Sequence, residues 1–245
     1  MSRRIALLND ARHYVGPELA RAFARRNHDL VIGEASDELV GELENLGARV
    51  VNVQGVSNLT EPQAAPLLVE SALAEFGRFD AAVAFSGQII PGRFLDSSIE
   101  DLRSIVSGCL EGPYHFLKAV APPLVAQGAG QIVLITSAAG ARPTKGAALY
   151  SSVRAAASMM ARNLAADIAP HGVQVNAIGT NFMDFPEFHA ASGTNDPVRR
   201  AALEARVPLR RMGGLEEFAN FSMAFLDGSS GFTTGQFVAY AGGWA

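Results

Sequence analysis

Three residues have the types and spacing that proton-transfer chemistry needs: Ser137, Tyr150 and Arg154. The apolar stretch 131–135 predicts a strand that leads into Ser137, and a helix is expected to begin near Tyr150. Tyr150 and Arg154 are four residues apart, so they face the same side of that helix. A fixed positive charge beside a phenol, with a hydroxyl donor opposite, favours the phenolate form. Taken singly, Tyr150 could be an ordinary buried tyrosine and Arg154 an ordinary solvent-exposed arginine. Their combination with a serine at the end of a strand predicts a catalytic site.

The composition is that of an ordinary globular protein. The 245 residues are 49% hydrophobic and 18% charged, and the formal net charge is −4. This length suffices for one large α/β domain, and the negative charge argues against nucleic acid, whose phosphates select basic surfaces. The single cysteine, Cys109, excludes an intramolecular disulfide and a CxxC metal site, so no metal is expected.

Targeting and membrane signals are not found in the sequence. The apolar run Ile5–Leu8 near the N-terminus is too short for the core of a signal sequence. No apolar run approaches the ~20 residues that span a bilayer. We therefore expect a cytoplasmic protein with no membrane partner.

Short apolar strands alternate with helical stretches along the chain. Strands are expected at 5–8, 30–33, 49–53, 80–85, 131–135, 173–178 and 236–240. Helices are expected at 16–26, 36–47, 61–76, 98–126 and 150–169, with an irregular, aromatic-rich segment at 179–195 and two further helical stretches after it. This alternation predicts one α/β domain over residues 1–245, with a doubly wound parallel sheet of the Rossmann-like, three-layer α/β/α type.

The first strand-to-helix turn, residues 9–16, is where such a fold would bind the phosphates of a nucleotide. Only Gly16 remains of the glycines that let a backbone approach a pyrophosphate. The Tyr14 ring would occupy that space, and the Asp10 carboxylate would repel a phosphate that it faced. We therefore expect no dinucleotide cofactor. The alternative is a diverged but working nucleotide loop in which Arg12 supplies the charge.

Several of these features are typical of one superfamily. The Ser137…Tyr150 spacing, the strand at 173–178 and the terminal Gly242-Gly243 match the short-chain dehydrogenases/reductases, which the chain resembles along nearly its whole length. The family's Tyr-x-x-x-Lys is here Tyr150-Ser-Ser-Val-Arg154, its glycine-rich first loop is lost, and its active-site Asn falls at Cys109.

Those departures resemble the halohydrin dehalogenases, a branch of the superfamily without a dinucleotide. Its members carry Ser-x12-Tyr-x3-Arg, which Ser137, Tyr150 and Arg154 meet in full. They also carry Thr-x4-Phe/Tyr-x-Gly in the first loop, where residues 14 and 16 fit and Asn9 replaces the Thr.

The resemblance implies a cofactor-independent lyase. Ser137 and Tyr150 would bind the hydroxyl of a vicinal haloalcohol, and Tyr150, supported by Arg154, would take its proton. The oxygen would then displace halide and close an epoxide; in reverse, a small anion such as halide, azide, cyanide or nitrite would open the epoxide. The implied partners are small haloalcohols, epoxides and halide.

The resemblance also implies two sets of binding residues. The halide or nucleophile would bind at the first-loop aromatic and the loop after the sixth strand, that is, at Tyr14, Thr180, Asn181, Phe182 and Met183. The substrate cavity would be shaped by Phe85, Ala139, Phe185 and Phe188. For Phe185 and Phe188, plain core packing is an equally open interpretation.

The superfamily also implies a homotetramer, because two of its helices pair across subunits. Broad small and apolar faces on the expected helices 98–126 and 150–169 suit that pairing. Trp244, near the C-terminus, either reaches a neighbouring subunit or packs on its own surface.

Two other functional classes stay open. One is an NAD(P)-dependent reductase whose first loop binds the cofactor although most of the usual glycines are missing. The intact Ser137 and Tyr150 permit this function. The other is a non-catalytic binding protein that kept the fold. Such a protein would be expected to have lost the Ser or the Tyr, and this sequence has both.

Overall fold

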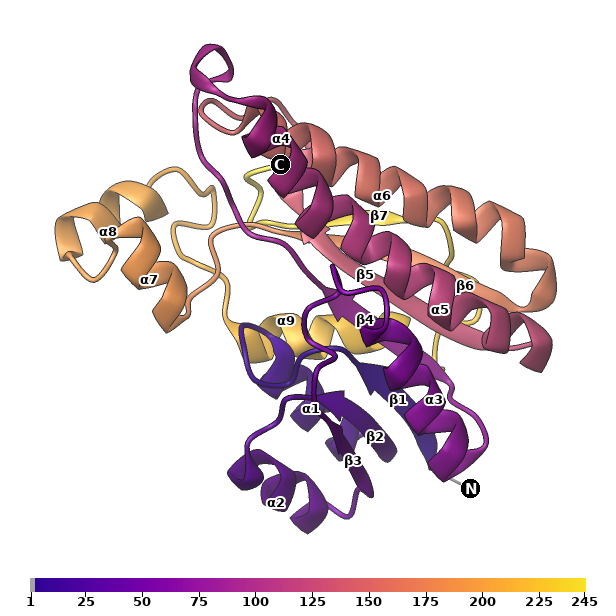
Figure 1. Cartoon of the computed structure of the whole chain (residues 1–245). Coiled ribbons are helices and arrows are strands. Elements are labelled where there is room, and N and C mark those ends of the chain that lie inside the picture. The colour runs from indigo at the N-terminus through magenta and orange to yellow at the C-terminus, as the bar shows by residue number, and fades with distance from the viewer. Residues whose placement is uncertain (1–2) are drawn as a thin grey trace.

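The computed structural model describes residues 3–245, and Met1 and Ser2 lie outside this range. Seven parallel strands form one sheet in the order β3-β2-β1-β4-β5-β6-β7 (Figure 1). The strands are β1 (Arg4–Leu8), β2 (His28–Gly33), β3 (Val50–Val53), β4 (Ala81–Phe85), β5 (Gly130–Ser137), β6 (Val173–Thr180) and β7 (Phe237–Tyr240). The predicted doubly wound sheet is therefore confirmed.

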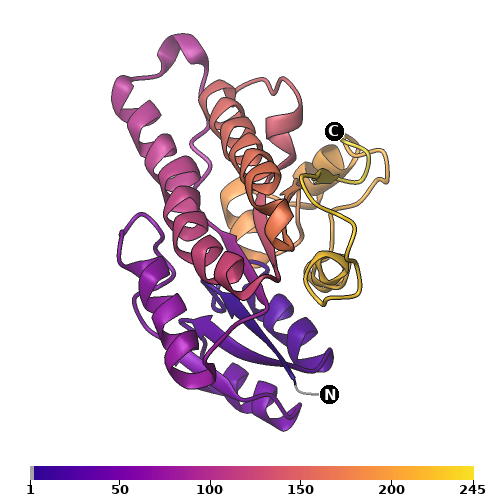
Figure 2. The same ribbon diagram turned by 90° about the vertical axis from the view of Figure 1, so that its right-hand side faces the viewer.

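Helices cover both faces of the sheet. They are α1 (Gly16–Arg25), α2 (Asp37–Asn45), α3 (Ala64–Phe76), α4 (Ile99–Val106), α5 (Gly112–Gln127), α6 (Ala148–Ile168), α7 (Pro186–Ser192), α8 (Pro197–Glu204) and α9 (Leu215–Ser222). Buried residues of α3, α5 and α6 pack on one face of the sheet, and those of α1, α2 and α9 pack on the other. Figure 2 shows α5 and α6 side by side.

The strands are apolar on both faces because helices cover both. Neighbouring residues of β1 show this: Leu7 and Leu8 are both fully buried, but they belong to the cores on opposite sides of the sheet. Successive side chains of a strand point to opposite faces. A continuous apolar run is therefore the expected sequence of a central strand in this fold.

The long helix expected at 98–126 is interrupted. A π-helical turn, Ser107–Glu111, joins α4 to α5. Pro113 has no N–H to donate to the carbonyl of Cys109, four residues earlier, so the regular bonding pattern is lost there. Gly87 lies against this turn, and a Cβ atom on it would come within 2.4 Å of the Cys109 sulfur. π-helical turns are frequent at functional sites.

The segment after β6 is more regular than expected. Residues 179–195 were expected to be irregular, but β6 continues to Thr180, and α7 follows. In Figure 1, α7 and α8 lie to one side of the two helical layers. In residues 3–245 no helix has both the length and the apolar character that crossing a membrane requires.

A buried histidine joins the amino ends of the strands. His28, at the start of β2, is fully buried, and its Nδ1 lies 2.9 Å from the carbonyl oxygen of Arg26. Its Nε2 lies 3.3 Å from Nε of Arg4, which can only donate. These partners assign a neutral ring with the proton on Nδ1. Burial and, next, the Arg4 charge lower the pKa of His28.

We predict that this histidine makes the fold less stable in acid. The folded-state pKa lies below the unfolded value of ~6.5, so the neutral ring contributes stability above that pH. This contribution is lost as the pH falls through the folded-state pKa. The unfolding free energy, measured in urea at neutral and mildly acidic pH, should fall less steeply in His28→Gln than in the wild type. The matched control is His171→Gln at an exposed position; equal slopes in all three proteins would contradict the assignment.

Candidate active site

The carboxyl ends of β4, β5 and β6 meet at one cavity of about 330 Å³. Ser137 and Thr180 end neighbouring strands and are paired in register. The cavity is lined by Tyr14, Phe85, Ser86, Gly87, Ile89, Ile135, Thr136, Ser137, Tyr150, Arg154, Thr180, Asn181, Phe182, Met183, Phe185 and Phe188. Ligands of doubly wound folds bind at this edge of the sheet. The volume is near the lower end of the range for small-molecule sites.

Ser137 is held by backbone groups on both sides. The N–H of Ala139 donates to its Oγ at 3.1 Å, and Oγ donates to the Thr180 carbonyl oxygen at 3.4 Å. The latter contact is long, so the hydroxyl proton is free to turn toward an oxygen in the cavity. Ser137 is 6% exposed, and it therefore meets only ligands that enter the cavity.

The first two turns of α6 place Tyr150 and Arg154 on one side of the helix, as predicted. Both are buried, and the Arg154 guanidinium carbon lies 5.1 Å from the centre of the Tyr150 ring. The turn after β5 packs directly on this helix. A Cβ atom at Gly140 would lie 2.8 Å from the Ala155 backbone nitrogen, so only glycine allows this approach.

Arg154 is a buried cation with few protein partners. Its Nη2 donates to the Ser86 carbonyl oxygen at 2.7 Å, and the Ser86 hydroxyl donates to Gly108 in the π-helical turn. Within residues 3–245, Nε and Nη1 of Arg154 have no hydrogen-bond partner, and no carboxylate forms an ion pair with it. An unpaired buried cation favours a negative charge in the cavity beside it.

Tyr14 crosses from the first turn to the end of β6. Its hydroxyl donates to Thr180 Oγ1 at 2.8 Å, and its ring centre lies 4.8 Å from that of Phe185 and 5.6 Å from that of Phe85. Burial raises the pKa of the Tyr14 phenol well above its usual value, although the bond to Thr180 opposes this. Tyr14 is therefore a neutral donor, distinct from Tyr150. Its φ of 50° is unusual for a bulky residue.

The side chain of Asp10 hydrogen-bonds to the backbone of the first turn, in which it lies. Asp10 Oδ1 accepts from the backbone N–H groups of Arg12 and His13 at 2.8 and 3.0 Å, and His13 Nδ1 lies 3.1 Å from Oδ2. The carboxylate thus occupies the anion-binding position of the turn. Gly16 lies under the Asp10 carbonyl oxygen, which would be 2.1 Å from an added Cβ.

An aromatic wall faces the buried trio. Phe182 has a φ of 48°, and its ring centre is 6.2 Å from Phe188 and 5.7 Å from Trp244. The guanidinium carbon of Arg206 lies 5.0 Å from the centre of the Phe182 ring. Trp244 is buried against its own chain, and Arg142 donates to its carbonyl oxygen. Two strained aromatic residues, Tyr14 and Phe182, therefore line one small cavity.

The structure brings together nearly all of the residues that the sequence singled out. The exception is Ala139, which does not line the cavity; it is buried in a small apolar cluster that contains Tyr150 and Trp244. Sequence reasoning missed five lining residues, namely Ser86, Gly87, Ile89, Ile135 and Thr136. Four of these end or directly follow β4 and β5, so the rule that ligands bind at strand ends would have found them.

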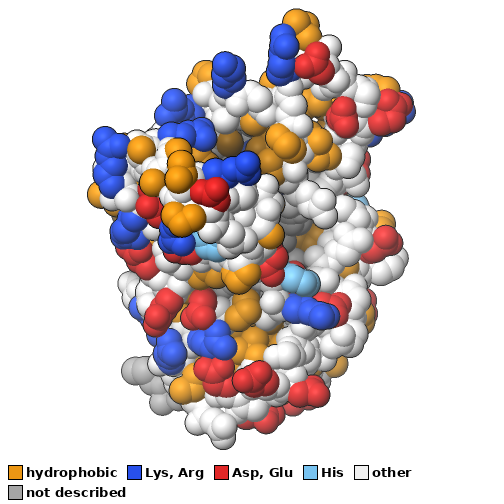
Figure 3. Space-filling model, turned by 90° about the vertical axis from the view of Figure 1, so that its left-hand side faces the viewer, with side chains coloured by type: hydrophobic (Ala, Val, Ile, Leu, Met, Phe, Trp, Pro, Cys, Tyr) orange, Lys and Arg blue, Asp and Glu red, His pale blue; other side chains and the backbone are white. Residues whose placement is uncertain are grey.

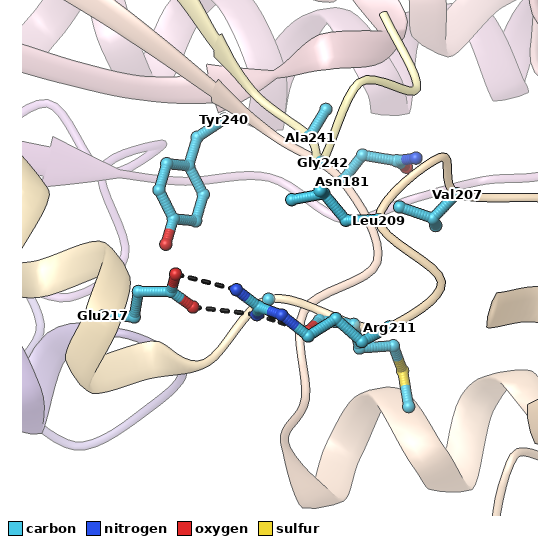
Figure 4. Close-up of a pocket in the computed structure, with 10 residues that line it drawn as sticks. Asn181, Val207, Leu209, Arg211, Glu217, Tyr240, Ala241 and Gly242 are labelled. Atoms are coloured by element: carbon cyan, nitrogen blue, oxygen red, sulfur yellow. Dashed lines mark hydrogen bonds and ion pairs between the residues drawn. The ribbon is translucent and has the colours of Figure 1, made fainter.

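A second cavity of about 100 Å³ lies on the other side of Asn181, which lines both. Figure 4 shows the Tyr240 hydroxyl pointing toward the Glu217 carboxylate, which Arg211 holds with two 2.8 Å bonds. Burial, with the Glu217 charge, raises the pKa of Tyr240 to about 12. This phenol is therefore unsuited to act as a base near neutral pH.

Comparison with known proteins places the chain in a family. The family model described as Enoyl-(Acyl carrier protein) reductase matches residues 11–245. The 3-oxoacyl-[acyl-carrier-protein] reductase FabG of Escherichia coli is 29% identical over 98% of this chain and 96% of its own. The acetoin dehydrogenase structure from Enterobacter cloacae has a TM-score of 0.84 and 26% identity, covering 100% and 96% of the two chains. A structure described as a dehalogenation enzyme has a TM-score of 0.86, covering 100% and 99%; its 24% identity shows the shared fold alone.

These relatives correct the predicted function. The sequence was interpreted as a halohydrin dehalogenase that closes epoxides without a nucleotide, and this prediction is wrong. The two of these relatives above 25% identity, the FabG reductase and the acetoin dehydrogenase, are oxidoreductases that match along nearly the whole chain. They favour the alternative of a short-chain dehydrogenase/reductase whose first loop works without the usual glycines. The Ser, Tyr and Arg trio is common to both interpretations, so it could not decide between them.

The family match over residues 11–245, the sheet order and the Ser137–Tyr150–Arg154 site together identify the chain as a member of the short-chain dehydrogenase/reductase family.

Proposed function

We propose that this chain is an oxidoreductase that interconverts the alcohol and carbonyl forms of a small, largely apolar molecule. The observation that carries the proposal is the match to oxidoreductases along nearly the whole chain. The placing of Ser137 and Tyr150 in one cavity beside the buried Arg154 cation equips the site for the proton transfer of that reaction. The aromatic lining and the modest volume of the cavity favour a compact substrate.

Tyr150 transfers the proton in this proposal. The substrate oxygen accepts hydrogen bonds from the Ser137 and Tyr150 hydroxyls, which fixes its position. The hydride that reduces a carbonyl carbon would come from a dinucleotide of the class the family implies, and the oxidised dinucleotide would take it back in the reverse direction. As negative charge develops on the substrate oxygen, Tyr150 gives up its proton to it; in the reverse direction the phenolate takes the proton from the alcohol. Arg154 stabilises the phenolate because it brings a permanent positive charge into a buried site.

The family implies a nicotinamide dinucleotide, and the first turn does not fit its pyrophosphate in the conformation described. The N–H groups of Arg12 and His13 already donate to Asp10, and the Tyr14 ring bridges the turn to Thr180. No binding geometry is therefore assigned to the dinucleotide. We expect the wild-type protein to bind NAD(H) and NADP(H) weakly and to turn over slowly.

The first prediction concerns the proton donor. Tyr150→Phe keeps the ring and removes the hydroxyl, so carbonyl reduction should fall about 100- to 10,000-fold, the usual contribution of a general acid. Tyr14→Phe is the matched control in the same cavity and should keep most of the activity. The assay follows nicotinamide oxidation with a panel of small ketones at saturating dinucleotide. Absence of turnover with every ketone and both cofactors would overturn the proposed function.

The second prediction concerns the charge beside the tyrosine. Arg154→Ala removes the cation that favours phenolate, so alcohol oxidation should lose most of its rate near neutral pH and recover in part at higher pH. Arg154→Lys keeps a charge and should keep part of the rate, with the alkaline limb of the pH–rate profile displaced. A wild-type rate for Arg154→Ala at pH 7 would mean that another group is the base.

The third prediction concerns the closed first turn. Tyr14→Gly removes the ring and relieves the left-handed backbone, so the dissociation constant for NADPH or NADH should fall by about tenfold or more. Titration calorimetry measures this directly. Asn27→Gly is the control, because residue 27 also has a positive φ but lies away from the cavity. Equal affinity in Tyr14→Gly and wild type would show that Tyr14 does not obstruct the cofactor.

We also propose that the chain forms a homotetramer and that the groove between α5 and α6 is one of its interfaces. This groove of about 730 Å³ is mainly apolar, and its residues Tyr114 and Met159 are 51% and 48% exposed. It also contains one charge of each sign, Lys118 on α5 and Asp167 on α6. A second copy of the same surface, turned about a twofold axis, would offer apolar contacts and opposite charges.

The fourth prediction tests this assembly. Met159→Arg places a charge in the groove and should lower the mass measured by light scattering at micromolar concentration. Leu67→Arg is the control, because Leu67 is 41% exposed on α3, away from the groove. A wild-type protein that is monomeric under these conditions would contradict the proposal.

A further inference from the structure

The segment 184–204, which we call the flap, forms part of the cavity wall. It contains α7 and α8, which lie to one side of the helical layers in Figure 1. In Figure 3, which views the molecule from the side of α7 and α8, hydrophobic side chains gather in the upper part of the face, with Lys and Arg side chains above and to the left and Asp and Glu side chains to the right. Phe185 and Phe188 of the flap line the cavity beside Tyr14 and Phe182. The position of the flap therefore sets the shape of the active site.

A chain of short hydrogen bonds ties the flap together. His189 Nε2 lies 2.6 Å from Asp184 Oδ1, and His189 Nδ1 lies 2.8 Å from Thr194 Oγ1. Thr194 Oγ1 lies 2.8 Å from Ser192 Oγ, which donates to the Phe188 carbonyl oxygen at 2.6 Å. Thr194 is 2% exposed and the His189 side chain 13%. The chain thus runs from the exposed carboxylate of Asp184, through the buried Thr194, to the backbone of Phe188.

The hydrogen count of this chain depends on the charge of His189. The four contacts need four hydrogens between their heavy atoms. The Thr194 and Ser192 hydroxyls supply one each, and an ionised carboxylate supplies none. A neutral imidazole adds one, which leaves one close contact between two acceptors. An imidazolium adds two, and every contact then has its hydrogen.

Asp184 does not supply the missing hydrogen. Its second oxygen accepts from Arg200 Nη2 at 2.7 Å, and Arg200 also pairs with Glu204 at 3.0 Å. Burial works to raise the pKa of Asp184, but the bonds from His189 and Arg200 outweigh it, so the pKa is lowered. Among residues 3–245, Asp184 is the only ion-pair partner of His189. The carboxylate is therefore ionised, and the fourth hydrogen must come from the histidine.

We propose that His189, as an imidazolium, is the positioning residue that holds the aromatic wall of the flap over the active site. Loss of its second proton breaks one link of the chain between Asp184 and Phe188 and loosens the flap. The flap is therefore tight when the ring is charged and loose when it is neutral. This inference concerns the shape of the site and does not depend on the reaction proposed above.

The protein carries its own reporter for the test. Trp244 is the single tryptophan, and its ring contacts Phe182, which in turn contacts Phe188 of the flap. We expect the emission of Trp244, recorded without substrate, to change between about pH 5.5 and pH 8.5. Over the same range, hydrogen exchange at residues 186–192, corrected for the intrinsic rate, should rise about fivefold, the factor that one ordinary hydrogen bond represents.

Three variants separate this proposal from a general effect of pH. His189→Gln cannot titrate and should abolish the change in emission and in exchange. Thr194→Val removes the acceptor for the Nδ1 proton, keeps the histidine, and should give fast exchange even in acid. His171→Gln, at an exposed position outside the flap, should behave as the wild type. The proposal is overturned if His189→Gln keeps the wild-type transition, if Thr194→Val keeps slow exchange in acid, or if wild-type exchange does not change with pH.

Discussion

The candidate site depends on one buried interaction, the hydrogen bond from Arg154 Nη2 to the carbonyl oxygen of Ser86. It joins α6 to the end of β4 and holds a permanent charge 5.1 Å from the centre of the Tyr150 ring. Because the rest of the guanidinium has no protein partner among residues 3–245, that charge acts on the cavity instead of being neutralised within the fold. The π-helical turn supports the same point, since Gly108 accepts the hydroxyl of Ser86. Helix, sheet end and turn are therefore coupled at Arg154.

The second constraint is competition for the space at the first turn. Asp10 takes the backbone N–H groups that an anion would use, and Tyr14 takes the space between the turn and Thr180. Both Tyr14 and Phe182 have left-handed backbones, which cost free energy unless the surroundings hold them. The contacts of Tyr14 with Thr180, Phe85 and Phe185 provide that support. The resulting cavity is small and aromatic, and it contains the Ser137–Tyr150 pair.

The error about function has a physical origin. The role proposed for Ser137, Tyr150 and Arg154 is proton transfer, which is shared by alcohol oxidation, carbonyl reduction and epoxide closure. The altered first turn is typical of the lyase branch, but it is a local feature of eight residues, 9–16. Similarity to reductases and dehydrogenases, in contrast, extends over nearly the whole chain. The Ser–Tyr–Arg motif therefore predicts proton transfer at a substrate oxygen, but it does not predict whether the overall reaction is an oxidation, a reduction or an epoxide closure.

The sequence by itself determined the sheet, the trio and most of the cavity wall. Apolar runs alternating with helices specify a parallel sheet, and helix periodicity puts Tyr150 and Arg154 on one face, because both depend on neighbours along the chain. Only the tertiary structure decided that Ala139 lies outside the cavity, that Trp244 packs on its own chain, and that His189 meets Asp184 and Thr194. The reason is that orientation, burial and hydrogen count are set by the packing of loops against strand ends, and residue spacing alone carries no information about that packing.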